Sequence, residues 1–337
     1  MFVLLYLISM QLKELSLEIT QRCPNYCIHC SSCSSLTKDV TMSYDKICEI
    51  INEAKDLGLK TLCISGGEPF LHPRIVDIIR YAAIKNLNIS VYTSGIYHDG
   101  IHYTSLPLRQ LAAIKDCATK LIFNVEASDD AIYNSVMGTT IGGFDMLKKS
   151  IEESCRLGIM VEAHIVPMKR NYKQILSIIS LCERLGVSKV SFLRLVLQGR
   201  AVDNKMDILL SDDEFEDVKI LINRYYKAHP NKIRVGIPFS ACTIKKNCLA
   251  GTDKLNIRYD GNVYPCEAFK NGEPQILSSY QPANIYNQSL SSIYFSSKYL
   301  EDIRSRLVKF QLVETCETCI NLSLIHISEP TRLALIS

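Results

Sequence analysis

Along the first two hundred residues, apolar positions follow two periods in turn, and this alternation predicts strands separated by helices. Short apolar runs predict buried strands at Leu15–Ile19, Thr61–Ile64, Ile89–Tyr92, Lys120–Val125, Met160–Val166 and Lys189–Leu193. Between them apolar residues recur at helical spacing, which predicts helices at Ser43–Leu57, Pro73–Lys85, Leu108–Asp116, Gly143–Leu157 and Tyr172–Leu185. We expect Pro73 to occupy the first helical turn of the second of these.

The predicted helices end in a repeated way, which strengthens the pattern. Leu-Gly stands at Leu57-Gly58, Leu157-Gly158 and Leu185-Gly186, and each pair precedes an apolar run. Glycine at this position can end a helix in the left-handed conformation. Strands that alternate with helices predict a parallel sheet with right-handed crossovers. The fold class is therefore α/β, a partial (β/α)6 TIM-type barrel with its chemistry at the C-terminal ends of the strands.

The pattern changes after about Val202. Ser211–Ala228 predicts one more helix, capped by Ser211, and short apolar runs then flank Asp260-Gly261, a strong hairpin signal. We place a domain boundary near Lys205. The barrel would occupy residues 1–205, and a small Cys-rich α+β domain would occupy residues 206–321.

Composition narrows the class of protein. The chain has 337 residues, of which 47% are hydrophobic, so it can bury a substantial core. Its net charge of +3 points to neither nucleic acid nor a membrane surface as a partner. The apolar start MFVLLYLISM lacks a basic region and a cleavage site, and it is too short to span a bilayer. We therefore expect a cytoplasmic protein whose 14 cysteines are thiols or metal ligands.

Three cysteines follow the first predicted strand in the spacing C-x3-C-x2-C: Cys23, Cys27 and Cys30. Polar neighbours and Pro24 favour a loop. Three thiolates can hold three irons of a [4Fe–4S] cluster and leave the fourth iron open to a small molecule. Half of a zinc site is the alternative interpretation.

Other polar residues stand where predicted strands end. They are Gly66, Gly67, Glu68 and Pro69 after the second strand, Ser94 after the third, Asn124 and Glu126 at the fourth, and Arg194 at the sixth. Glycines allow a close approach of the backbone to a ligand, and a carboxylate suits an ammonium group. Because these strand ends share one face of a barrel, the residues are expected to form one site.

In combination, these motifs resemble those of the radical SAM superfamily. The resemblance implies that the open iron binds S-adenosylmethionine (SAM), and that reductive cleavage of SAM gives a 5′-deoxyadenosyl radical. It implies that Gly66–Pro69 holds the SAM amino group, that Ser94 lies near SAM, and that Asn124 and Glu126 contact its ribose or carboxylate. Independently of the resemblance, Arg194 could neutralise the SAM carboxylate, and a surface ion pair is the alternative interpretation of this residue. The resemblance further implies oxygen-free chemistry and a one-electron donor such as a flavodoxin or ferredoxin.

A second set of cysteines lies towards the end of the chain. Cys248, Cys266, Cys316 and Cys319, with the hairpin signal before Cys266, resemble the SPASM (or shorter twitch) extension of radical SAM enzymes. The resemblance implies an auxiliary [4Fe–4S] cluster, and a zinc ribbon is the alternative. Such extensions are frequent among enzymes that modify peptides and proteins, so a peptide or protein is the expected substrate. Cofactor or haem-like biosynthesis on a small molecule is an alternative. A non-catalytic zinc or iron–sulfur scaffold is an alternative of another class.

The final residues look foreign to the rest of the chain. Leu322–Arg332 reads LSLIHISEPTR, which resembles a translated adapter used for DNA sequencing libraries. We expect Leu322–Ser337 to be an artefact. The SPASM pattern calls for a further cysteine at the position of Ile325, inside this tail.

Overall fold

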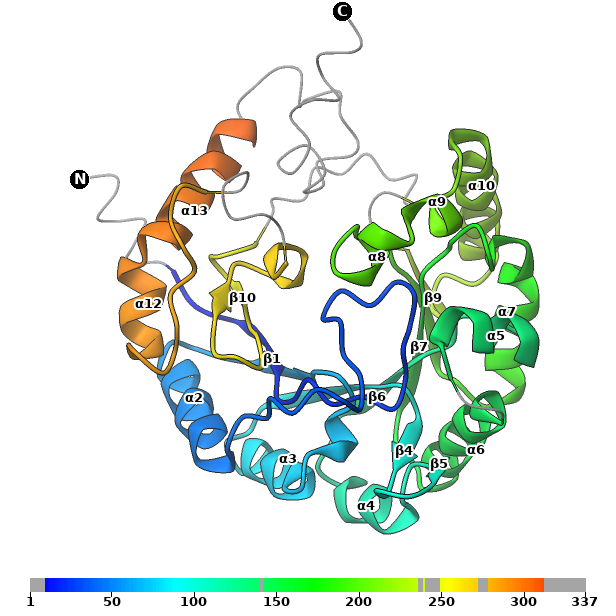
Figure 1. Cartoon of the computed structure of the whole chain (residues 1–337), viewed down its shortest axis with the longest axis horizontal. Coiled ribbons are helices and arrows are strands. Elements are labelled where there is room, and N and C mark those ends of the chain that lie inside the picture. Colours follow the sequence, from blue (N-terminus) through cyan, green and yellow to red (C-terminus); the bar gives the residue numbers. More distant parts are fainter. Residues whose placement is uncertain (1–9, 140–141, 236–238, 240–248, 272–277, 312–337) are drawn as a thin grey trace, which may run out of the picture.

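The computed structural model describes residues 10–139, 142–235, 239, 249–271 and 278–311. Residues 308–311 are described by their backbone alone. In this part of the chain, nine strands form one sheet in the order β11-β10-β1-β2-β3-β6-β7-β8-β9, and helices surround it (Figure 1). The predicted α/β fold class is confirmed. None of the described helices combines the length and the apolar character that a membrane crossing requires.

Six parallel strands form the centre of the sheet, and all six were predicted. They are β1 (Glu14–Glu18), β2 (Thr61–Ser65), β3 (Asn88–Thr93), β6 (Lys120–Asn124), β7 (Val161–Ile165) and β8 (Lys189–Phe192). Leu15 pairs with Leu62 and Leu17 with Ile64, so apolar residues of neighbouring strands share the buried side that faces the helices. The residues between them, such as Ser16 and Cys63, face the concave inner side.

The predicted helices cover the outer side of these strands. They are α2 (Tyr44–Asp56), α3 (Ile75–Ile84), α4 (Leu108–Ile114), α6 (Gly143–Arg156) and α7 (Ile175–Arg184), the last preceded by the 3-10 turn η2 (Tyr172–Gln174). In α2 the buried residues recur at helical spacing, and the Ser43 side chain accepts a hydrogen bond from the Lys46 amide. The prediction for Pro73 is wrong, because it lies in a turn before the first residue of α3.

Several short elements were not predicted. A two-stranded hairpin, β4 (Ile96–His98) with β5 (Tyr103–Ser105), follows β3, and helix α5 (Asp130–Met137) follows β6. The signals for α5 were present in the sequence. Asp129 caps its first turn, and Gly138 ends it with φ +55°.

The sheet continues into the second half of the chain. After α8 (Arg200–Asp203), α9 (Lys205–Ile208) and α10 (Asp212–Ala228), strand β9 (Ile233–Val235) pairs in parallel with β8. At the opposite edge, β10 (Lys254–Ile257) pairs in parallel with β1 and in antiparallel with β11 (Val263–Tyr264), which confirms the hairpin. The boundary that we placed near Lys205 falls at the start of α9, and the sheet extends beyond it.

Three further elements complete the described chain. The 3-10 turn η3 (Glu267–Phe269) follows Cys266 and lies inside the ring of helices, while α12 (Leu290–Ser296) and α13 (Lys298–Gln311) continue the ring beyond α2 (Figure 1). Cys248, Cys316, Cys319 and the tail Leu322–Ser337 lie outside the described residues.

Candidate functional site

Residues 19–35, here called the cluster loop, connect β1 to the segment before α2 and lie inside the ring of helices (Figure 1). Main-chain hydrogen bonds fix this loop. The Cys23 amide donates to the Ser35 carbonyl at 3.2 Å, and the amides of Tyr26 and Ile28 donate to carbonyls at the end of α5, at 3.1 and 3.0 Å. The backbone of the loop is therefore defined by its neighbours as well as by its own sequence.

The three motif cysteines lie close enough for their charges to interact. Burial raises the pKa of the Cys23 thiol well above its ordinary value, and Cys27 and Cys30 raise it further. Burial and then Cys30 raise the pKa of Cys27, while Arg200 opposes the shift. Three neighbouring thiolates, of which Cys23 is buried and Cys27 and Cys30 are partly buried, need a cationic centre between them, so this donor set fits a cluster that deprotonates its ligands.

Among the described residues, no three His, Cys, Asp or Glu side chains surround a single metal-ion position. A zinc ion takes all of its ligands at one centre, whereas an iron–sulfur cube receives each thiolate on a different iron.

The glycine pair after β2 packs directly against the cluster loop. The Gly67 amide donates to the Thr20 carbonyl and the Glu68 amide to the Arg22 carbonyl, both at 2.7 Å. A Cβ atom on Gly67 would lie 2.1 Å from the Arg22 carbonyl oxygen, and one on Gly66 would lie 2.4 Å from that of Thr20. The sequence suggested a close approach to a ligand. The close approach that the structure contains is to the backbone of the cluster loop.

Glu68 connects the ends of β2 and β3. Its buried carboxylate accepts from the Phe70 amide at 3.1 Å, the Thr93 hydroxyl at 2.8 Å, and the amide and hydroxyl of Ser94 at 2.7 and 2.6 Å. These four bonds use the acceptor capacity of a carboxylate. Burial raises its pKa to about 7, although the bonds from Ser94 act in the opposite direction. Glu68 and Ser94 thus stabilise the ends of β2 and β3 through their hydrogen bonds. Pro69 begins the 3-10 turn η1 (Pro69–Leu71). The contact of Glu68, Pro69 and Ser94 with SAM stays a prediction.

Glu126 occupies the corresponding place after β6. Its buried carboxylate accepts from the Val166 amide at 2.9 Å and from the Asn124 side chain at 3.4 Å, and it faces His29 Nε2 of the cluster loop at 3.8 Å. Burial raises the pKa of Glu126 to about 8, so its neutral form predominates at pH 7. Burial, and then Arg200, lower the pKa of His29 to about 4. A neutral carboxyl and a neutral imidazole therefore face each other beside the cysteines.

Two arginines follow β8, and they take different places. Arg200 Nε donates to the Cys27 carbonyl at 2.8 Å, and its backbone amide donates to the Cys30 carbonyl at 3.0 Å. Its guanidinium also lies 4.0 Å from the centre of the Tyr26 ring, within cation–π range. The sequence had suggested Arg194 for the SAM carboxylate. Arg194 is partly buried, which lowers its pKa, and the thiol of Cys266 acts against this shift.

Buried polar atoms near the cluster loop support the assignment of a cofactor there. Within the described part of the chain, Tyr133 Oη, His29 Nδ1, Arg200 Nη2 and both amide atoms of Asn25 have no hydrogen-bond partner. The Tyr133 ring is fully buried, which raises the pKa of its hydroxyl, and Cys27 raises this pKa further. Donors of this kind around thiolate ligands tune an iron–sulfur cluster. The residues present therefore fit the group.

Comparison with protein families decides the class. The model described as the radical SAM superfamily matches residues 17–199, more than half of the chain. The chain belongs to this superfamily. A second model, the iron–sulfur cluster-binding SPASM domain, matches residues 248–320. The chain is therefore a radical SAM enzyme that takes a [4Fe–4S] cluster and SAM, and the SPASM domain implies auxiliary iron–sulfur clusters.

Individual relatives resemble the chain over most of its length. It is 24% identical over 304 residues to the tungsten-containing aldehyde ferredoxin oxidoreductase cofactor-modifying protein of Pyrococcus furiosus, covering 86% of this chain and 82% of that protein. The crystal structure of Streptococcus suis SuiB bound to SAM matches 92% of this chain and 72% of SuiB, with a TM-score of 0.71 and 16% identity. The structure of hexahistidine-tagged anSMEcpe with bound SAM matches 91% of this chain and 88% of its own, with a TM-score of 0.67 and 14% identity. These likenesses confirm the partial-barrel fold.

Proposed function

We propose that this radical SAM enzyme modifies a peptide or protein. Cys23, Cys27 and Cys30 would hold the cluster. When bound, the cluster would supply one electron for the reductive cleavage of SAM to methionine and a 5′-deoxyadenosyl radical, which would abstract a hydrogen atom from the substrate. The observation that carries the cluster assignment is the proximity of these three thiols on a loop that packs against Gly66 and Gly67.

The strand ends would bind and orient SAM. We assign Gly66, Gly67, Glu68 and Pro69 to its amino group, Ser94 to its vicinity, and Asn124 and Glu126 to its ribose or carboxylate. Arg194 is assigned to the carboxylate. For Glu68 the contact would be indirect, because its oxygens already accept four hydrogen bonds. It would hold the Ser94 backbone in place.

The substrate class follows from the second domain and from the relatives. We assign Cys248, Cys266, Cys316 and Cys319 to an auxiliary cluster, which would bind the substrate or take back an electron. SuiB is also known in a complex with its precursor peptide SuiA, and that structure matches 88% of this chain with a TM-score of 0.70. This likeness supports a peptide substrate. We further propose a flavodoxin or ferredoxin as the electron donor.

A second candidate is the modification of a cofactor. It is favoured by the Pyrococcus furiosus relative, whose name describes a cofactor-modifying protein and which matches over most of both chains.

Anaerobic reconstitution tests the activity. The cluster-loaded chain, reduced with dithionite in the presence of SAM, should release 5′-deoxyadenosine, which mass spectrometry can quantify. A Cys23→Ala/Cys27→Ala/Cys30→Ala variant should release none, whereas Cys48→Ala, a partly buried thiol of α2, should behave as the parent. If folded, cluster-loaded parent protein releases no 5′-deoxyadenosine, the proposal fails.

The two substrate classes can be separated with deuterium. A peptide substrate deuterated at carbon should transfer deuterium to 5′-deoxyadenosine, and its own mass should change. Transfer from a deuterated small-molecule cofactor, with none from any peptide of a candidate library, would favour cofactor modification instead.

A further inference from the structure

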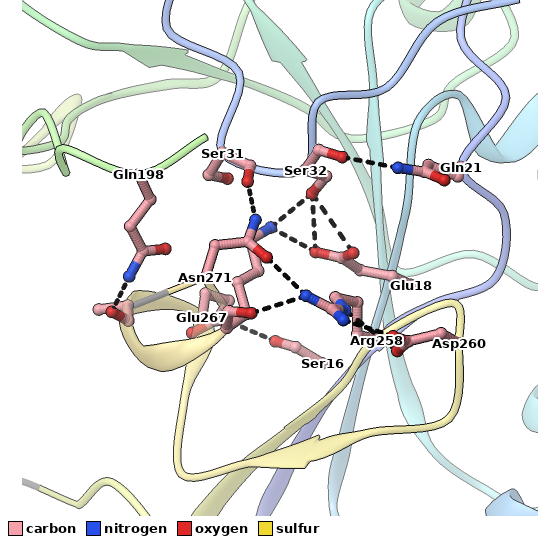
Figure 2. A network of polar contacts seen from close by, with 12 residues as sticks. Ser16, Glu18, Gln21, Ser31, Ser32, Gln198, Arg258, Asp260, Glu267 and Asn271 are labelled. Atoms are coloured by element: carbon pink, nitrogen blue, oxygen red, sulfur yellow. Dashed lines mark hydrogen bonds and ion pairs between the residues drawn. The ribbon is translucent and has the colours of Figure 1, made fainter. Parts of the chain in front are cut away.

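A segment of the second domain reaches into the site and touches the cluster loop. This junction segment, Glu267–Asn271, directly follows Cys266 (Figure 2). The Lys270 ammonium forms an ion pair with Glu18, and it donates to the Ser32 hydroxyl at 2.8 Å. The Ser32 hydroxyl in turn donates to the two Glu18 oxygens at 3.2 and 3.3 Å. The side chains of Lys270 and Glu18 are only 9% and 2% exposed, so water screens this pair little.

Asn271 makes the second contact. Its side-chain amide donates to the Ser31 carbonyl, and its oxygen accepts from Arg258 Nη1 at 2.5 Å. The same Arg258 nitrogen donates to the Lys270 carbonyl at 2.9 Å, and Arg258 Nε donates to Asp260 at 3.0 Å. The turn of the β10–β11 hairpin therefore holds the junction segment in place, as Figure 2 shows.

These contacts lie on both sides of the three motif cysteines, before Cys23 and after Cys30. Glu18 is the last residue of β1, where the loop begins, and Ser31 and Ser32 directly follow Cys30. The Gln21 side chain also donates to the Ser32 carbonyl at 3.0 Å, which closes the loop upon itself. One lysine of the second domain thus joins the entry and the exit of the loop, with all three motif cysteines between them.

We propose that Lys270 and Asn271 are positioning residues for the N-terminal cluster. They fix the exit of the cluster loop and hence the place of Cys30, so the segment next to the auxiliary ligand Cys266 sets the geometry of the SAM-binding cluster. The inference rests on the proposed assignment of Cys23, Cys27 and Cys30 as ligands. Without Lys270, the buried Glu18 carboxylate loses its cation and must take up a proton or admit water, and the Ser32 hydroxyl loses one of its two partners.

Hydrogen exchange of the metal-free chain tests the first half of the proposal. Lys270→Met and Asn271→Ala should each speed deuterium uptake in peptides spanning residues 19–35 by about tenfold, the order expected for losing a hydrogen bond to a charged or buried group. Lys120→Met is the matched control, because Lys120 contacts both Glu162 oxygens at 3.0 Å on β6 and β7. It should leave exchange at residues 19–35 unchanged. If Lys270→Met fails to fold, Asn271→Ala carries the test, since it leaves no buried charge without its partner.

Electron paramagnetic resonance of the reduced, reconstituted protein tests the second half. Addition of SAM should shift the N-terminal cluster signal of the parent. In Lys270→Met a smaller fraction of this signal should shift, and in Lys270→Arg the shifted fraction should equal that of the parent. The triple variant Cys23→Ala/Cys27→Ala/Cys30→Ala supplies the auxiliary background. The proposal is overturned if hydrogen exchange at residues 19–35 is unchanged in both Lys270→Met and Asn271→Ala. It is also overturned if exchange is faster but SAM shifts the same fraction of the cluster signal in Lys270→Met as in the parent. If the triple variant keeps the SAM-dependent signal, the assignment of the ligands fails instead, while the exchange result still stands.

Discussion

The cluster loop and the junction segment lie side by side, but they are fixed by different parts of the chain. The loop is held mainly by main-chain hydrogen bonds, from its own flank at Ser35, from the carbonyls of α5, and from the segment after β2. The junction segment is held by side chains, namely the Lys270–Glu18 ion pair, the Asn271 amide and the Ser16 hydroxyl on Glu267.

This difference indicates which substitutions each region tolerates. A main-chain contact depends on the space around the backbone, so it is sensitive to glycine positions and tolerant of most other changes. A side-chain contact depends on one functional group, so it is lost when that group is removed. Substitution of the neighbouring glycines should therefore displace the cluster loop, and removal of charged groups should displace the junction segment.

The largest effect is expected where a glycine meets the loop. Gly67→Ala places a Cβ atom 2.1 Å from the Arg22 carbonyl oxygen, which is backbone and cannot move aside. Overpacking of this kind costs about 3 kcal/mol in the free energy of unfolding, and the displaced loop should also take up less iron. Urea unfolding of the metal-free protein and iron analysis after reconstitution measure the two effects.

Gly158→Ala is the control for this prediction. Gly158 has φ +79° with no atom within 4 Å of its Cβ position, so only the left-handed backbone is penalised, by about 1 kcal/mol. Equal losses in the two variants would contradict the main-chain account of the loop.

Arg200→Met tests a side chain that adds to the main-chain contacts of the loop at the Cys27 carbonyl. It removes the 2.8 Å bond to the Cys27 carbonyl and the contact with the Tyr26 ring. A hydrogen bond from a charged group contributes about 2 kcal/mol, so a smaller loss of stability than in Gly67→Ala is expected. Chemical denaturation compares the two variants directly. A larger loss in Arg200→Met would mean that side chains dominate in this loop too.

Acid should act on β7 of the barrel, apart from the cluster loop and the junction segment. Burial, together with Arg234 and Lys120, lowers the pKa of His164 to about 3, whereas a histidine in the unfolded chain titrates near 6.5. The unfolded state therefore binds more protons between these values, and the free energy of unfolding falls as the pH drops below about 6.5. His164→Gln should flatten this loss by up to about 1.4 kcal/mol per pH unit, as urea titrations at several pH values would measure. A pH dependence identical to that of the parent would refute it.

The smallest effect is expected at the cap of α5, the helix whose final carbonyls hold the loop. Asp129 accepts a hydrogen bond from the Ile132 amide at 2.9 Å, and loss of such a cap costs about 1 kcal/mol. Asp129→Ala should therefore lower stability slightly and speed hydrogen exchange at Tyr26 and Ile28. The exposed Asp130→Ala, which leaves the cap in place, should not speed exchange there.

The sequence alone was sufficient for the parts of the fold that depend on local periodicity. The six central strands, the helices of the barrel and the β10–β11 hairpin appear where predicted, because apolar spacing and turn residues act over a few positions. The three motif cysteines were also recognisable, since their ligand spacing lies within one loop. Helix α5 was not predicted, although its capping residues Asp129 and Gly138 are present in the sequence, because it spans only 8 residues.

Only the tertiary structure decided which groups meet across the molecule. Arg200 donates to the Cys27 carbonyl of the cluster loop, Glu68 accepts from Ser94, and Lys270 pairs with Glu18 across 252 positions of the chain. No local pattern encodes such pairs, because they arise where the sheet brings β10 beside β1 and the chain after β8 beside Cys30. The physical reason is one of range: periodicity and capping are properties of neighbouring residues, whereas a buried charge finds its partner only after the backbone has folded around it.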